Sequence, residues 1–415
     1  MKRINKILSL IIVCLIVVLL PQKNYALSIE NNESKAELLT VNNQQNISSE
    51  ERRLRNIVVD YMYQMGSIRW TTSTNIDTKC VALCTDKNCQ TALEVGKIYR
   101  GLPYKHSSST LDRMQYCLDE NNSLKEWVVD LGDFGGFQTY FGSACYSSIQ
   151  LAWARVSNTV NATCAMEALL RPDLVGTIPV GNWSDLWTNK INDQNTSKCF
   201  DLLGSDAIYE DYALVKAGVA FIRLGDDGAH AVMAATDAVV VRNANGKINP
   251  DSSYFYTHEQ GGPNSDSSVI SSWSLNRKRT FASLASQYFL PITIKELAEG
   301  KMDEVSVDII DDLDGIYGLT TGIIVSNYYI DAVIVDIKEN GNDFFNKKVY
   351  CRVDNIKDYN DTVAMFDRSF VKEYDLALLT RSIIDLNFNE NNTYHVTFTV
   401  LLQNGVSEVV KEYDF

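Results

Sequence analysis

The chain is 415 residues long, which exceeds one ordinary domain and predicts two. Apolar residues make up 45% of it and charged residues 22%, so the composition is that of a globular protein and excludes a disordered one. The formal net charge of -14 repels nucleic acid and anionic membrane surfaces, which excludes both as expected partners.

Residues 1–26 have the pattern of a secretory signal peptide. Positively charged Lys2, Arg3 and Lys6 precede an apolar run, and Ala26 is a small residue at the expected cleavage site. The apolar run is short for a membrane span, which favours secretion over the alternative of an uncleaved anchor. We therefore expect a protein that is secreted or held at the cell surface. Residues 27–48 are polar and without periodicity, and predict a flexible leader.

Two interpretations of the cysteines near residue 80 stay open. Cys80, Cys84 and Cys89 form local disulfides, or they bind zinc with Cys117 as the fourth ligand. The spacing lacks a CxxC pair, which favours disulfides. No other metal site or cofactor is expected.

Helical patterns dominate the first part of the chain and strand patterns follow. Ser48 and Glu51 make a capping box before an apolar helical pattern that ends at Gly66. A second helix is predicted from Cys145, and short strands separated by Gly-containing turns are predicted over 218–294. Helices followed by a run of antiparallel strands predict an α+β fold.

From residue 298 the pattern changes to short β-prone runs without proline. The runs are 305–307, 323–325, 332–335, 348–353, 383–388, 395–402 and 406–410. Asn340-Gly341 and Asn404-Gly405 between them are hairpin signals. Residues 298–415 are therefore predicted to form an all-β sandwich of Ig-like type, with a cell-surface ligand as its expected partner. His395 is interpreted as an ordinary strand residue.

Cys145 is the candidate nucleophile. It lies where a Gly/Ser-rich segment meets the predicted helix, so unpaired amides and the positive end of the helix dipole favour its thiolate form. The alternative is a buried or disulfide-bonded cysteine. A cysteine nucleophile needs an imidazole to take its proton. His230, which opens an apolar strand after a Gly-containing turn, is the candidate base, whereas His106 is expected in a loop.

A third polar group must orient the imidazole. His258, Glu259 and Gln260 follow at the end of the next predicted strand. Strand alternation places His258 and Gln260 on one face of the strand and Glu259 on the other. Alternation alone does not decide which of the three orients the imidazole. The pair Trp183 and Trp187 is interpreted as packing, with a groove for a glycan or peptide as the alternative.

The order of these residues resembles the NlpC/P60-type papain-like cysteine peptidases and amidases of bacterial cell-wall enzymes. The resemblance covers residues 49–297. It rests on Gly101-Leu102-Pro103-Tyr104, Cys145-Tyr146-Ser147-Ser148 with Ala152-Trp153, Gly228-Ala229-His230-Ala231-Val232-Met233, and Phe255-Tyr256-Thr257-His258.

This resemblance implies a papain-like domain in which Cys145 is the nucleophile and His230 the base. His258 would orient the imidazole, with Glu259 as a close rival, and Tyr104 would lie beside the oxyanion region. The implied activity is hydrolysis of an amide bond through a thiolate acyl-enzyme, without a cofactor. The implied substrate is a peptide of cell-wall peptidoglycan, with another protein as the alternative substrate and transamidation as the alternative reaction.

The chain departs from the family on both sides of the cysteine. Ala144 and Tyr146 stand where the family usually has Asp and Ser. These departures leave a second function open, in which the papain-like domain is catalytically degenerate and the protein is a surface binding or adhesion module.

Overall fold

The computed structural model describes residues 47–77, 92–104, 109–126, 142–160, 166–170, 176–184, 186, 195–226, 228–266, 269–350, 371–383 and 385–415. The expected signal peptide, nearly all of the expected leader, Cys80, Cys84, Cys89, His106 and Trp187 lie outside these residues. The described residues belong to one compact unit.

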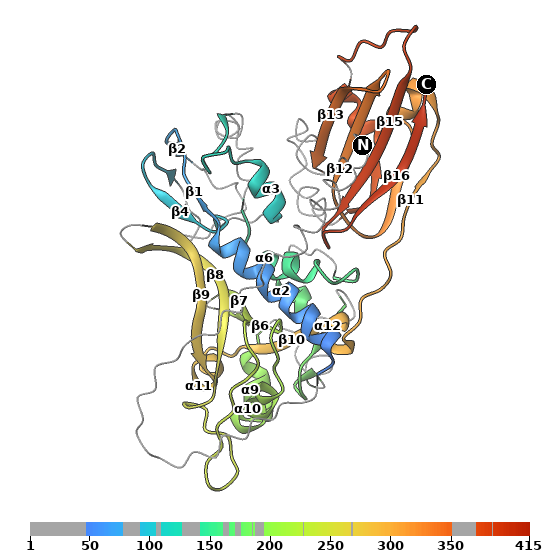
Figure 1. Cartoon of the computed structure of the whole chain (residues 1–415). Coiled ribbons are helices and arrows are strands. Elements are labelled where there is room, and N and C mark those ends of the chain that lie inside the picture. The colour runs from blue at the N-terminus through green and yellow to red at the C-terminus, as the bar shows by residue number, and fades with distance from the viewer. Residues whose placement is uncertain are drawn as a thin grey trace, which may run out of the picture. The chain divides into compact units, whose positions relative to one another are not determined.

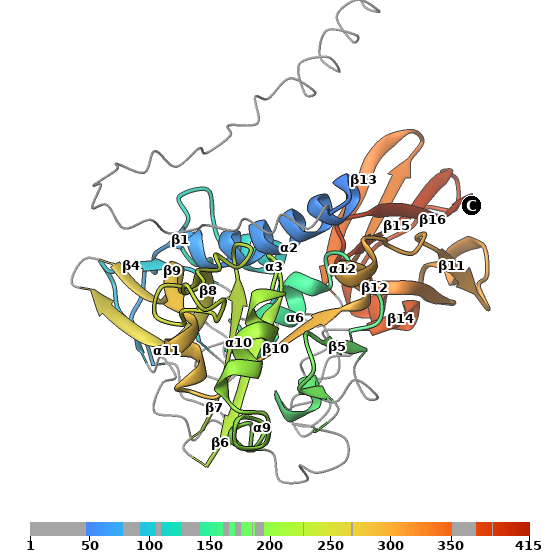
Figure 2. The same ribbon diagram turned by 90° about the horizontal axis from the view of Figure 1, so that it is seen from below.

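The described residues form two large β-sheets, the long helix α2 and several short helices, an arrangement compatible with the α+β class (Figure 1). The helices of the first part are α2 (Ser49–Ser67), α3 (Leu111–Tyr116), α6 (Cys145–Trp153), the 3-10 helix η2 (Met166–Leu170), α9 (Ser197–Leu203), α10 (Ser205–Ala213), α11 (Phe281–Ala285) and α12 (Lys295–Glu299). Helices α9 and α10 lie side by side (Figure 2).

The first sheet has eight strands in the order β1-β4-β9-β8-β7-β6-β10-β5. Their bounds are β1 (Arg69–Trp70), β4 (Ile98–Arg100), β5 (Thr177–Pro179), β6 (Ala220–Gly225), β7 (Gly228–Ala234), β8 (Tyr254–Asp266), β9 (Val269–Thr280) and β10 (Leu290–Ile294). Only β4 and β9 pair in parallel. A separate pair joins β2 (Ile76–Asp77) to β3 (Ala92–Leu93).

Helix α2 confirms one half of the predicted capping box, the N-cap bond of Ser48, whereas the Glu51 carboxylate binds Arg55 and Lys216. The Ser48 side chain accepts a hydrogen bond from the backbone N–H of Glu51 at 2.9 Å. The buried side chains of the helix recur at helical spacing and belong to the first hydrophobic cluster, together with α6 and the inner strands. The helix therefore packs on the core of the first sheet, as its periodicity predicts.

The second sheet contains six strands. These are β11 (Val307–Ile310), β12 (Ile323–Glu339), β13 (Asn342–Tyr350), β14 (Val371–Asp375), β15 (Tyr394–Leu402) and β16 (Ser407–Asp414), with η3 (Gly315–Leu319), η6 (Leu376–Leu379) and α14 (Thr380–Ile383) between them. The order is β11-β12-β15-β16, and β13 and β14 also pair with β12. A second hydrophobic cluster belongs to these elements.

The predicted turn at Asn340-Gly341 and the predicted hairpin around Asn404-Gly405 are both present in the second sheet. Asn340 and Gly341 have φ values of 50° and 82°, the two positive values that a type I′ turn requires between β12 and β13. Gly405 ends the corresponding turn between β15 and β16, which pair in antiparallel fashion. The strand alternation of β15 buries every second side chain, as the sequence pattern predicts.

Two expected strands differ from the structure, and one further strand was not expected. The strand expected over 383–388 is wrong, because the segment begins in helix α14 and continues without a ladder, while Leu386 and Phe388 still pack on the second cluster. The strand expected to open at His230 begins two residues earlier, at Gly228, and ends at Ala234. The strand that was not expected is β14.

Within the described ranges, no helix combines the length and apolar character that crossing a membrane requires.

Candidate active site

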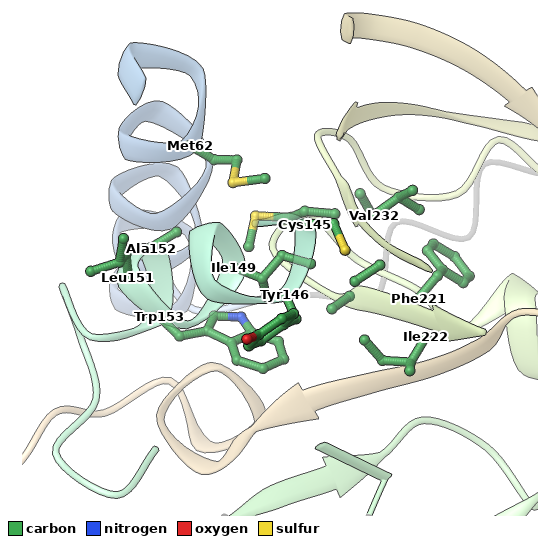
Figure 3. Packing of buried hydrophobic residues seen from close by; sticks show 14 of the residues in the cluster. Met62, Cys145, Tyr146, Ile149, Leu151, Ala152, Trp153, Phe221, Ile222 and Val232 are labelled. Carbon is green, nitrogen blue, oxygen red and sulfur yellow. The ribbon is translucent and has the colours of Figure 1, made fainter. Parts of the chain in front are cut away.

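Cys145 is the first residue of helix α6, as predicted. Helix α6 packs between α2 and β7, and Figure 3 shows Cys145 at the end that faces Val232 of β7. The N-cap residue Ala144 has no side-chain oxygen that accepts amides of the first turn, and its own N–H donates to Ser147 Oγ at 2.7 Å. At the other end, the indole N–H of Trp153 donates to the Gly218 carbonyl at 2.9 Å. The helix is therefore anchored at both ends.

His230 lies beside this thiol. The hairpin β6–β7 pairs throughout its length, but β7 pairs with β8 only at Met233 and Ala234. The two strands thus separate at the level of His230, whose side chain is 26% exposed and lies close enough to Cys145 to lower the pKa of the thiol. The Cys145 residue is 1% exposed, so the imidazole is the more accessible member of the pair.

Glu259 occupies the other side of the imidazole. Its Oε2 atom lies 3.4 Å from His230 Nε2. Because Nε2 faces this carboxylate, Nδ1 is the ring nitrogen left for the thiol. Two arginines of β9 hold the same carboxylate: Arg277 Nη1 lies 2.7 Å from Oε1 and Arg279 Nη2 lies 2.6 Å from Oε2. The three side chains Cys145, His230 and Glu259 thus form a continuous line.

Electrostatics favour the thiolate–imidazolium form of this pair. Burial alone would raise the pKa of Cys145, but the hydrogen bond and charge of His230, with donors from the Ala231 backbone and Tyr104, lower it overall. Burial alone would lower the pKa of His230, but its bonds to Cys145 and Glu259 raise it. Despite burial, His230 and Arg279 hold the pKa of Glu259 at about 2, so this carboxylate is ionised.

Tyr104 contacts the candidate nucleophile. Its hydroxyl donates to Cys145 Sγ at 3.8 Å, and its backbone bridges to Ser143 in the segment that precedes the cysteine. A donor at that distance stabilises the charged form of the sulfur. The turn before it needs glycine, because Gly101 has a φ of 76° and a Cβ there would lie 2.3 Å from Trp273.

His258 and Gln260 contact other parts of the structure. His258 is buried, its Nδ1 accepts the backbone N–H of Asn276 at 3.2 Å, and its ring packs beside Tyr63. Burial lowers the pKa of His258 to about 4, so the ring is neutral. Gln260 is buried against Leu102. Of the three residues left open by the sequence, the structure brings Glu259 to the imidazole.

The remaining candidates from the sequence lie apart from this line of residues. Cys117 and Cys199 are free and buried, and burial raises the pKa of each thiol to about 12. The indole N–H of Trp183 donates to the Pro291 carbonyl within the core, in agreement with packing. His395 lies on β15 beside Asp414. Among the described residues, no group of His, Cys, Asp or Glu side chains is arranged to hold a metal ion.

Sequence reasoning missed the two arginines that hold Glu259. The sequence pattern that could have found them is a pair of arginines two residues apart, Arg277 and Arg279, on the strand that pairs with the strand of Glu259. Alternate residues share a face, so two arginines two apart on a neighbouring strand indicate a carboxylate opposite them.

Comparisons with known proteins place no further constraint on the site, since no family model, no curated protein and no solved structure matches the chain.

Proposed function

We propose that the protein is a cysteine hydrolase that cleaves amide bonds, with Cys145 as nucleophile, His230 as general base and acid, and Glu259 as the group that orients the imidazole. The observation that carries this proposal is the unbroken line of contacts from the Cys145 thiol through the imidazole to a buried, ionised carboxylate. Such a line is the arrangement that activates a thiol for acyl transfer.

The reaction would proceed in two steps. The Cys145 thiolate attacks the carbonyl carbon of the amide, and the backbone N–H of Cys145 donates to the developing oxyanion at the start of α6. The imidazolium of His230 gives its proton to the leaving nitrogen, so an amine departs and a thioester remains. His230 then takes a proton from water, which attacks the thioester and releases a carboxylic acid and the thiolate.

The proposed substrate is a peptide of cell-wall peptidoglycan, with the first sheet and its helices as a divergent papain-like domain. The support is the resemblance of residues 49–297, together with a nucleophile on a helix that packs against the strand of the base. The second sheet is proposed to be an Ig-like domain that holds the enzyme to a surface. Secretion, which the first 26 residues suggest, would bring the enzyme to such a substrate.

A degenerate, purely binding protein is the rival function. A disulfide at Cys145, or a Cys145 remote from His230, would favour it. Cys145 is free, and His230 lies close enough to lower the pKa of its thiol. These contacts support the enzyme over the rival.

The decisive experiment compares Cys145→Ala with Cys199→Ala. Cys199 is an equally buried free thiol outside the line of contacts, so it is the matched control. Release of peptides from peptidoglycan fragments is followed by chromatography. We expect Cys145→Ala to abolish turnover with an unchanged circular dichroism spectrum, and Cys199→Ala to retain it. Equal turnover by Cys145→Ala and the wild type would overturn the proposal.

A further inference from the structure

Gln260 is the centre of a buried hydrogen-bond cluster next to the nucleophile. Its amide nitrogen donates to the Leu102 carbonyl at 2.8 Å and to Ser272 Oγ at 3.2 Å. Its amide oxygen accepts from Ser143 Oγ at 2.6 Å. All three side chains, Gln260, Ser143 and Ser272, are at most 5% exposed, so water does not compete for these bonds.

The chemistry of the partners fixes the orientation of this amide. A backbone carbonyl only accepts, so the group that faces Leu102 must be the amide nitrogen of Gln260. The amide oxygen then faces Ser143, whose hydroxyl must donate. The Leu102 carbonyl also accepts from the indole N–H of Trp273 at 2.7 Å. Gln260 consequently has one arrangement in which every bond is satisfied.

The two ends of this cluster lie on the two segments that position the thiol. Ser143 is two residues before Cys145, and its backbone N–H donates to the Pro103 carbonyl at 3.1 Å. Leu102 belongs to the turn that carries Tyr104, whose hydroxyl reaches Cys145 Sγ. Gln260 directly follows Glu259, which orients the imidazole. A single side chain thus ties the nucleophile segment, the Tyr104 turn and the Glu259 strand together.

We infer that Gln260 is a positioning residue, which through its bond to Ser143 sets the distance between the Cys145 thiol and His230. This inference rests on the proposed function and goes beyond it. Without that bond, the segment before α6 loses its tie to β8, and the thiol moves relative to the imidazole and the Ala231 N–H. Because both groups lower the pKa of the thiol, the displacement raises that pKa. A displacement of about 1 Å costs up to roughly a hundredfold in rate.

Ser143→Ala tests the inference, because it removes only the hydroxyl that binds the Gln260 oxygen. Ser272→Ala is the matched control: it removes a hydroxyl that accepts from the Gln260 amide and donates to the Leu102 carbonyl, but it leaves the bond between Gln260 and Ser143 in place, and Leu102 keeps its bonds from Gln260 and Trp273. The rate of alkylation of Cys145 by iodoacetamide is measured against pH, with the labelled peptide identified by mass spectrometry. Thermal unfolding of each variant reports stability separately.

We expect Ser143→Ala to shift the midpoint of the Cys145 alkylation profile to higher pH and to slow labelling at pH 6 by about tenfold or more. Ser272→Ala should leave the midpoint in place. Gln260→Leu, which removes both the acceptor for Ser143 and the donor to Leu102, should shift the midpoint at least as far as Ser143→Ala, and adding Ser143→Ala to it should shift the midpoint no further. An unchanged midpoint in Ser143→Ala, or equal shifts in both serine variants, would overturn the positioning role.

Failure of the proposed function gives a different result. A wild-type Cys145 that reacts no faster than free cysteine near neutral pH would contradict both the catalytic assignment and the positioning role. If the wild-type Cys145 is alkylated quickly and Ser143→Ala leaves the pH profile of alkylation unchanged, only the positioning role is contradicted. Alkylation needs no substrate, so neither outcome depends on the identity of the cleaved peptide.

Discussion

Replacing Glu259 by Gln removes one negative charge from among three cationic groups. The Glu259 side chain is 4% exposed and that of Arg279 is 9% exposed, so this ion pair is buried. Arg277 is 53% exposed, and solvent screens its share of the interaction. The variant therefore leaves Arg279 buried beside His230 without a counter-charge.

Two routes give the magnitude of this loss. The pKa of Glu259 is about 2 in the folded protein against the ordinary value of 4.5, and at about 1.4 kcal/mol per unit that difference corresponds to about 3 kcal/mol. Removing one partner of a buried ion pair costs roughly 3–5 kcal/mol in general. We expect Glu259→Gln to lower the free energy of unfolding by about 3 kcal/mol at pH 7.

The pH dependence has a definite sign. The folded pKa of Glu259 is depressed, so its stabilisation is fully present above the ordinary value of 4.5 and disappears as the pH falls towards 2. The difference between the wild type and Glu259→Gln should therefore be constant from about pH 5 to 6.5 and shrink below about pH 4.5. Above about pH 6.5 it also decreases, because Cys145 and Glu259 together raise the pKa of His230 from 6.5 to about 9.

Urea denaturation followed by circular dichroism at several pH values measures this difference. Glu210→Gln is the matched control, because Glu210 pairs with Arg242 at 2.7 Å but is 53% exposed. We expect the control to lose less than about 0.5 kcal/mol. A loss below about 1 kcal/mol in Glu259→Gln, or a loss that is the same at pH 3 and pH 7, would refute the assignment of a buried, ionised carboxylate.

Three further outcomes are expected. His230→Ala removes the imidazolium that lowers the Cys145 pKa, so the midpoint of Cys145 alkylation should move to higher pH; an unmoved midpoint contradicts the contact. Burial raises the pKa of Asp211 from 3.8 to about 6, so the protein loses stability as the pH rises through 6 and this buried carboxyl ionises. Asp211→Asn should therefore have a free energy of unfolding about 1–2 kcal/mol higher than the wild type at pH 8 and the same as the wild type at pH 4. Ser48→Ala should cost about 1 kcal/mol in urea unfolding, and no loss would contradict the cap.

Local sequence signals predicted those parts of the site that depend on neighbours in the chain. The start of α6 at Cys145 follows from a Gly/Ser-rich segment before an apolar helical pattern, and the cap of α2 follows from Ser48 and Glu51. His230 was found for a similar reason, because a Gly-containing turn and an apolar run define the start of β7. Each of these signals lies within a few residues of the feature that it predicts.

The choice of Glu259 depended on information that strand alternation does not contain. The register of β8 against β9 shifts between Thr257 and Glu259, and again between Gln260 and Asn264. Each irregularity changes the face of the sheet to which the following side chains point. Strand alternation therefore does not identify which of His258, Glu259 and Gln260 faces the imidazole. Bulges of this kind depend on tertiary pairing, and the sequence of one strand does not reveal them.

The expected strand over 383–388 failed for a related reason. Its apolar residues were interpreted as a strand because they lie close together, and Ile383, Leu386 and Phe388 do bury against the second cluster. The described residues of this segment form no ladder with another strand. Burial was predictable from composition, whereas ladder formation depends on tertiary pairing that the composition does not contain.

The buried cysteines respond to unfolding in opposite directions. Folding raises the pKa of Cys117 and Cys199 to about 12 and lowers that of Cys145, because its partners come from β7 and from the Tyr104 turn. In the unfolded chain all three return to ordinary thiols. Cys145 is therefore a thiol that denaturation makes less nucleophilic, while the other two become more so. One labelling experiment along a denaturant gradient thus follows assembly of the site and loss of the core in the same molecules.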